Sequence, residues 1–154
     1  MQKFQWFCVV VLIGWTISFM GCGKVNRILV NLVELNLLRT NFKDTRILND
    51  LTQLTHLNLG GNQINDISSL TVLTRLKNLF LWGNKINDIS SLSDLTQLTF
   101  LSIWSNEISD ISPITGLVNL RFLFLEGNPI TDKTPLHTLL GKNPNVDIDI
   151  DIND

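Results

Sequence analysis

Few residues of this 154-residue chain have the types and the spacing that catalysis needs. The two histidines, His56 and His137, have no cysteine or pair of carboxylates nearby at the spacing of a zinc site. Ser68, Ser90 and Ser112 each follow an Asp-Ile pair, and this recurrence favours capping of short helical turns over nucleophilic catalysis. Neither a glycine-rich phosphate loop nor a set of nucleophile, base and orienting group is visible. We therefore predict a protein that is not an enzyme, with no catalytic residues, no cofactor and no metal.

Carboxylates alternate with apolar residues near the C-terminus. Asp147, Asp149 and Asp151 would project from one side of a strand at steps of about 6.6 Å. Carboxylates can bind calcium, but this spacing is too wide to enclose an ion unless the chain also forms a loop. We favour edge protection, in which the charges deter the terminal strand from pairing with other chains. Val146 and Ile148 are expected to take the inward positions of this strand, one residue late in the frame of the preceding sequence.

That frame is a repeat of 22 residues. It reads Leu-x-x-Leu-x-Leu-x-x-Asn-x-Ile-x-x-Ile-x-x-Leu-x-x-Leu from Leu54 and restarts at Leu76, Leu98 and Leu120, although the last copy is incomplete. A fixed period of this length is typical of a solenoid, in which each coil buries its apolar face against the next. The Leu-x-Leu step predicts a short strand, and the apolar residues three apart near the end of the frame predict one helical or 3₁₀ turn.

One polar residue recurs inside the apolar frame, where the chain must turn. An asparagine side chain carries one acceptor and two donors, so it can bind backbone groups that a turn leaves unpaired. A degraded copy of the repeat comes first, with Thr40 at this position and Thr45 in place of an apolar residue, as expected for a terminal coil. The full copies predict a ladder of stacked amides formed by Asn62, Asn84, Asn106 and Asn128.

This pattern resembles the leucine-rich repeat family, and within it the internalin-like class with short repeats. The likeness is clearest in the segment Asn-Lys-Ile-Asn-Asp-Ile-Ser-Ser-Leu from Asn84 to Leu92, and it covers roughly residues 29–150. The resemblance implies an α/β solenoid with a curved parallel sheet on its concave side and short 3₁₀ or helical turns on its convex side. It also implies that proteins bind on the concave face.

The first 21 residues differ from the rest. Lys3 is their only charge, the stretch from Phe4 to Met20 is almost wholly apolar, and Gly21-Cys22 follows. This arrangement is typical of a secretory signal peptide, and the Gly-Cys pair resembles the end of a bacterial lipobox, whose cysteine is lipidated. We predict lipidation of Cys22 and a membrane anchor at the bacterial cell envelope, outside the cytoplasm. The alternatives are secretion and an uncleaved N-terminal helix that anchors the chain.

Composition divides the chain into segments and narrows its partners. The formal net charge of −2 argues against nucleic acid, and both cysteines lie at or before residue 22, so the repeats are expected to contain no disulfide. The segments are a signal peptide (1–21), an N-terminal tether and cap (22–31), about five leucine-rich repeats (32–142) and a C-terminal capping strand with an acidic tail (143–154).

Residues beside the inward leucines of each strand must point to the concave surface. In three adjacent repeats these positions are rich in aromatic residues, and an exposed aromatic group with a polar rim is typical of a binding hot spot. Two alternatives are rings that pack on one another and only stiffen the sheet, and a surface for self-association. The predicted ligand-binding residues are Phe80, Trp82, Phe100, Ser102, Trp104, Phe122, Phe124 and Glu126.

We therefore favour a membrane-anchored module that binds a protein or peptide on its aromatic concave face. A carbohydrate ligand is an alternative, since aromatic platforms also stack on sugar rings. A structural or regulatory subunit of an envelope enzyme is another, although no convergent cluster of titratable residues supports it. A short array with a purely structural role is the last.

Overall fold

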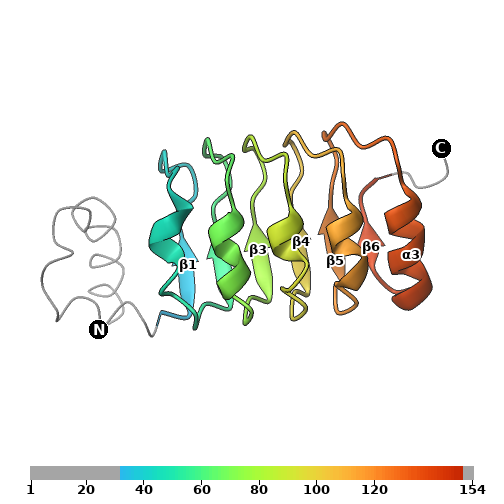
Figure 1. Cartoon of the computed structure of the whole chain (residues 1–154), viewed down its shortest axis with the longest axis horizontal. Helices are drawn as coiled ribbons and strands as arrows, with labels where there is room; N and C mark the ends of the chain where they lie inside the picture. The colour runs from blue at the N-terminus through green and yellow to red at the C-terminus, as the bar shows by residue number, and fades with distance from the viewer. Residues whose placement is uncertain (1–31, 151–154) are drawn as a thin grey trace, which may run out of the picture.

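The computed structural model describes residues 32–150, which form a solenoid of stacked coils (Figure 1). Each coil contains one short strand and one helical turn. In chain order the elements are β1 (Glu34–Asn36), η1 (Thr45–Leu48), β2 (His56–Asn58), η2 (Ser68–Val72), β3 (Asn78–Phe80), η3 (Ser90–Leu92), β4 (Phe100–Ser102), η4 (Ser112–Gly116), β5 (Phe122–Phe124), α3 (Thr134–Lys142) and β6 (Asp147–Ile148), where η denotes a 3₁₀ helix.

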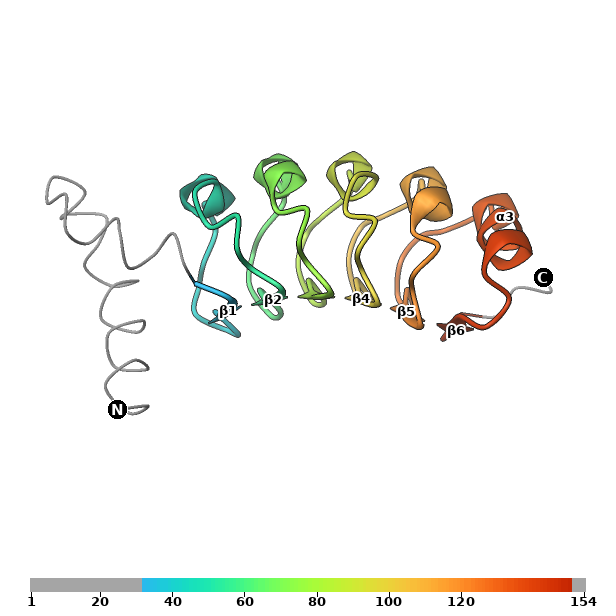
Figure 2. The same cartoon turned by 90° about the horizontal axis from the view of Figure 1, so that it is seen from below.

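The strands form one parallel sheet in the order β1-β2-β3-β4-β5-β6. Leu57 pairs with Leu79, and Leu79 pairs with Leu101, so the register follows the repeat of the sequence. Figure 2 shows the sheet along the concave side of the arc and the helical turns along its convex side. These features confirm the predicted curved solenoid.

The core lies between the sheet and the helical turns. Leu57, Leu79, Leu101 and Leu123, the central residues of four strands, are each 1% exposed or less. Burial of one such side chain contributes about 1.5–3 kcal/mol, and a single coil could not bury its own leucines without its neighbours. The repeating aliphatic frame therefore stabilises the array as a whole.

The predicted asparagine ladder is confirmed. The Oδ1 of Asn84 accepts a hydrogen bond from the N–H of Ile64 (3.0 Å), and its Nδ2 donates to the carbonyls of Leu59 (3.1 Å) and Leu81 (2.8 Å). Each amide thus bonds its own coil and the coil before it. The same pattern holds at Asn62, Asn106 and Asn128.

The degraded first coil replaces frame residues with polar ones that still find partners. Thr40 takes the ladder position, where its Oγ1 donates to the carbonyl of Leu37 (2.8 Å). Thr45 is buried, and its Oγ1 donates to the carbonyl of Asp66 (3.0 Å) and accepts from the Oγ of Ser69 (2.7 Å). These substitutions therefore do not leave the replaced positions of the coil unbonded.

Aspartates cap the convex turns, so the predicted serine caps were wrong. The Oδ1 of Asp88 accepts from the backbone N–H of Ser90 (2.8 Å), which is an Asx turn. This hydrogen bond is the main cause that lowers the pKa of Asp88 below its usual value. The aspartate accepts because the serine N–H at the start of the turn has no carbonyl partner within the helix. The same bond joins Asp66 to Ser68, Asp110 to Ser112 and Asp132 to Thr134.

The C-terminal coil departs from the repeat. The nine-residue helix α3 (Thr134–Lys142) stands where earlier coils have a 3₁₀ turn of three to five residues, and the sequence analysis did not predict it. Ile148 pairs with Leu123, so the expected register, with Val146 as the first inward strand residue, was wrong. The longer helix delays the strand by more than one residue.

Asp149 completes the end of the sheet. Inside the array, the N–H of Ile103 bonds to the carbonyl of Phe124 in the next coil (2.9 Å). The equivalent N–H of Leu125 has the carboxylate Oδ1 of Asp149 as its acceptor instead (2.6 Å). The aspartate therefore satisfies a backbone donor at the terminal edge, in addition to any repulsion of other strands.

The predicted signal peptide, the tether and Cys22 lie outside the described residues, as does Asp151. Among residues 32–150, no helix is long and apolar enough to cross a membrane.

Candidate functional site

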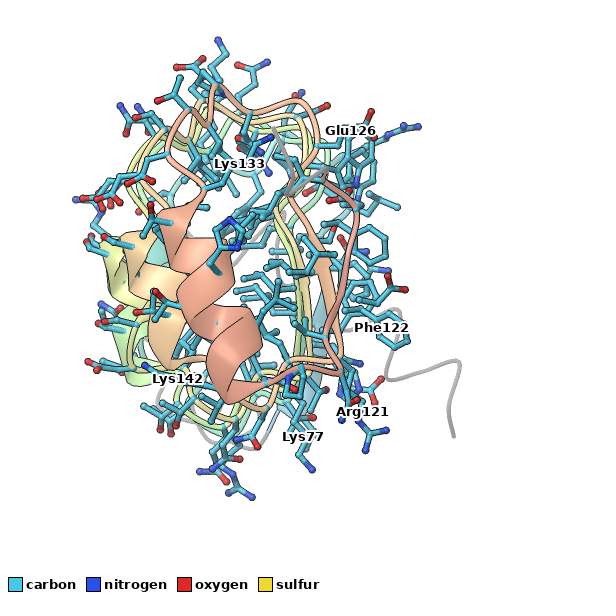
Figure 3. All side chains as sticks on the ribbon, turned by 90° about the vertical axis from the view of Figure 1, so that its right-hand side faces the viewer. Lys77, Arg121, Phe122, Glu126, Lys133 and Lys142 are labelled. Carbon is cyan, nitrogen blue, oxygen red and sulfur yellow. The ribbon has the colours of Figure 1, made fainter. Side chains whose placement is uncertain are left out.

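The sheet brings the predicted aromatic residues together on its outward face. Phe100 of β4 pairs in register with Phe122 of β5, and Phe80 of β3 pairs with Ser102 of β4. Figure 3 shows Phe122 projecting from the sheet on the side away from α3. The strands therefore present these side chains on the concave face, in the register that the repeat predicted.

Phe100 is the centre of a packed group of rings. Its ring centroid lies 4.7 Å from that of Phe80, 5.4 Å from that of Phe124 and 6.0 Å from that of Phe122, with the rings tilted by 37° to 47°. These distances fall in the range that favours aromatic pairs, which are worth about 0.5–1.5 kcal/mol each beyond the area they bury. Contacts among the rings thus fix the orientation of the group.

The two tryptophans form a second stack beside the phenylalanines. The rings of Trp82 and Trp104 are nearly parallel, at 5° with centroids 5.1 Å apart. Trp82 also lies over Gly60, where a Cβ atom would come within 2.6 Å of its ring, and the guanidinium of Arg39 lies 5.5 Å from its centroid. Gly60 is therefore required for this stack, because any larger residue would displace the indole.

Exposure separates the rings into two kinds. Trp104 is 39% exposed and Phe122 is 43% exposed, whereas Phe80, Trp82, Phe100 and Phe124 are half-buried. The rings pack on one another, as one interpretation expected, and they also leave an apolar surface open.

Ser102 does not belong to this open surface. Its residue exposure is 3%, because Phe80 and Phe124 occupy the in-register positions on the two neighbouring strands. The prediction that it contacts a ligand directly was wrong. The flanking rings leave this small side chain covered.

The N-terminal part of the concave face is polar. The side chains of Asn36 and Asn58 accept hydrogen bonds from backbone N–H groups two residues later (both 3.0 Å). The Nδ1 of His56 lies 3.8 Å from the Oε1 of Glu34. Arg39, the cation on Trp82, was missed by the sequence analysis, although the repeat frame places it one coil before Gly61 and beside the tryptophan column.

The remaining polar residues form no competing site. Within residues 32–150 no three histidine, cysteine, aspartate or glutamate side chains are placed to hold a metal ion. A shallow hollow on the convex side is lined by Asp66, Asp88 and Ser91 among others. Its two carboxylates cap neighbouring turns, and the buried Oγ of Ser91 has no hydrogen-bond partner.

Comparison with protein families and known structures agrees with this geometry. The family model described as Leucine Rich repeats (2 copies) matches residues 74–113 and 96–151, and the model described as Leucine Rich Repeat matches residues 53–73. No curated protein gives a significant match.

Solved structures show the same fold. Internalin C2 of Listeria monocytogenes is 36% identical, with a TM-score of 0.74, over 84% of this chain and 57% of that one. An internalin (InlF) of the same species is 29% identical, with a TM-score of 0.62, over 82% of this chain and 51% of that one. A leucine-rich repeat protein of Leptospira interrogans is 24% identical, with a TM-score of 0.58, over 82% of this chain and 39% of that one.

This chain thus spans between about two fifths and three fifths of the length of each of these structures. From the family matches and the parallel sheet of repeating coils, we conclude that it belongs to the leucine-rich repeat family and is internalin-like in structure.

Proposed function

We propose that this protein is a non-enzymatic module that binds a protein or peptide on its aromatic concave face. Leucine-rich repeat proteins are generally protein-interaction modules, and that general role applies to this chain. The observation that supports the specific face is the exposure of Trp104 and Phe122, at 39% and 43%, over a packed bed of other rings.

The packing of the bed favours binding. A ring held in place by its neighbours loses little conformational freedom when a partner covers it, and aromatic side chains bury large areas. Trp104 is fixed by its stack on Trp82, and Phe122 by its contact with Phe100. Such pre-organised aromatic anchors, surrounded by polar residues such as Glu126, are the usual centres of protein interfaces.

We further propose that a lipid on Cys22 tethers the repeats to the bacterial cell envelope. The support is the sequence alone, which places an apolar stretch before Gly21-Cys22. A tethered module with a pre-organised aromatic face is suited to hold a partner at the membrane surface.

Site-specific crosslinking tests the binding face. A photoreactive phenylalanine analogue is introduced at Phe122 in the full chain, in the native host, and compared with the same analogue at Val72. Val72 is a matched control because it is 45% exposed but belongs to η2 on the convex side. We expect a defined adduct from position 122 that is lost when Trp104→Ala is added. Equal adducts from both positions would contradict the proposal.

Metabolic labelling with a fatty acid tests the tether. We expect label in the wild-type chain and none in Cys22→Ser. Equal labelling of the two would exclude Cys22 as the lipid site, and absence of label in both would favour an anchor helix or secretion.

A further inference from the structure

One column of the concave face changes character along the solenoid. Gly60, Trp82, Trp104 and Glu126 hold the same position in successive coils. The coils stay in register here, since the N–H of Gly83 bonds to the carbonyl of Trp104 (3.0 Å) and the next equivalent bond ends on the carbonyl of Glu126 (2.8 Å). The column therefore runs from a glycine through two indoles to a carboxylate.

The indoles lean toward the N-terminal end of this column. Trp82 covers Gly60, the residue one coil earlier, and Trp104 stacks on Trp82. One face of the Trp104 ring is therefore covered by an indole, and the other is directed toward the coil of Glu126. The exposure of Trp104 and of Glu126 shows that this end of the stack is accessible.

The other end of the same stack already binds a cation. The guanidinium of Arg39 lies 5.5 Å from the centroid of Trp82, which is within the distance for a cation–π interaction. At the open end, the indole of Trp104 has a carboxylate as its neighbour and no cation from its own column. An indole face next to a carboxylate combines the two features that attract a lysine or arginine side chain.

The basic residues of the C-terminal half do not neutralise this position. Figure 3 shows Glu126 at one edge of the concave face and Lys77 and Arg121 at the opposite edge, with Phe122 between them. Five strand positions separate Arg121 from Glu126, which corresponds to roughly 16 Å. This separation is about twice the screening length at physiological salt.

We infer that Trp104 and Glu126 form a subsite for the lysine or arginine side chain of a peptide partner, whose neighbouring apolar residues cover Phe122 and the rings around it. This inference rests on the proposed function and adds the chemistry of the partner. The cation stacks on the open face of Trp104 and pairs with the carboxylate of Glu126. The occupant is a cationic, partly apolar segment of a protein.

A peptide selection tests the inference even while the natural partner is unidentified. The full chain in lipid nanodiscs is used to select binders from a random displayed heptapeptide library, with a Trp104→Ala chain for counter-selection. The best peptide is synthesised with its lysine or arginine, and again with norleucine or citrulline at that position. Both peptides are titrated against wild type, Glu126→Gln and the convex-side control Val72→Ala.

We expect the selected peptides to carry lysine or arginine, and removal of that charge to weaken binding to wild type by about two- to fivefold. Glu126→Gln should weaken binding of the charged peptide and reduce this difference, whereas Val72→Ala should change neither.

Two results would overturn the inference, and they are distinguishable. Peptides that depend on Trp104 but bind equally well without a cation, or equally well to Glu126→Gln, would leave the proposed function intact and remove the cation subsite. Failure to obtain any peptide that depends on Trp104 would count against both.

Discussion

The two sides of the same strands follow different rules. On the inward side, β3, β4 and β5 present Leu79, Leu101 and Leu123, which are identical and fully buried. On the outward side, the next residues are Phe80, Ser102 and Phe124, a group that varies from coil to coil. The constant side specifies how coils stack, and the variable side specifies the surface they display.

The same contrast appears along the concave face. Its first coils carry Asn36 and Asn58, whose side chains bond their own backbone, whereas later coils carry rings that pack across strands. The fold tolerates both because neither contributes to the inward frame. Changes to the frame should therefore reduce stability, and changes to the outward rings should mainly alter binding.

The largest effect is expected from the asparagine ladder. Asn84→Ala would leave the N–H of Ile64 and the carbonyls of Leu59 and Leu81 without their partner in the core. Each unsatisfied buried group costs about 1–3 kcal/mol, so we expect the free energy of unfolding to fall by about 3 kcal/mol or more in urea denaturation.

The control for this change is Asn87→Ala, since Asn87 is exposed and lies outside the ladder. It should alter stability by less than about 0.5 kcal/mol. Similar losses in the two variants would show that the ladder does not hold the coils together.

A smaller effect is expected from the residue before each ladder asparagine. Gly83 has a φ of +64°, and a Cβ there would meet no atom within 3.6 Å, so Gly83→Ala should destabilise through backbone strain alone, by about 1–2 kcal/mol. Ser105 holds the equivalent position with a φ of +53°. Ser105→Gly should therefore raise the free energy of unfolding by up to about 1 kcal/mol. Thermal unfolding of both variants checks this, and a loss of stability in Ser105→Gly would argue against strain at this position.

The smallest effect concerns the convex caps. The Ser90 N–H lowers the pKa of Asp88 below its usual 3.8, so the folded state binds this proton less readily than the unfolded chain. The contribution is present above the usual pKa and is lost as the pH falls below about 4. Asp88→Asn keeps an acceptor but does not titrate, so its stability should fall less steeply with acid. Unfolding curves measured between pH 5 and pH 2 test this, and equal slopes for wild type and variant would contradict it.

The repeat made most of the fold predictable. A period of 22 residues fixed the strands, the ladder and the outward positions, because each depends only on its place in the frame. The frame failed where the chain leaves the period, at α3 and at Ile148. It also could not show the lean of Trp82 over Gly60 or the burial of Ser102, since both depend on side chains from neighbouring coils.

The central claim is that the exposed rings form a contact surface that the fold does not need. The most direct test is the free energy of unfolding of the double variant Trp104→Ala, Phe122→Ala, measured by urea denaturation. Because both rings are about two fifths exposed, we expect a loss below about 2 kcal/mol, with the aromatic-dependent adduct abolished. A loss above about 4 kcal/mol would instead show that these rings mainly stiffen the sheet, and would contradict the account.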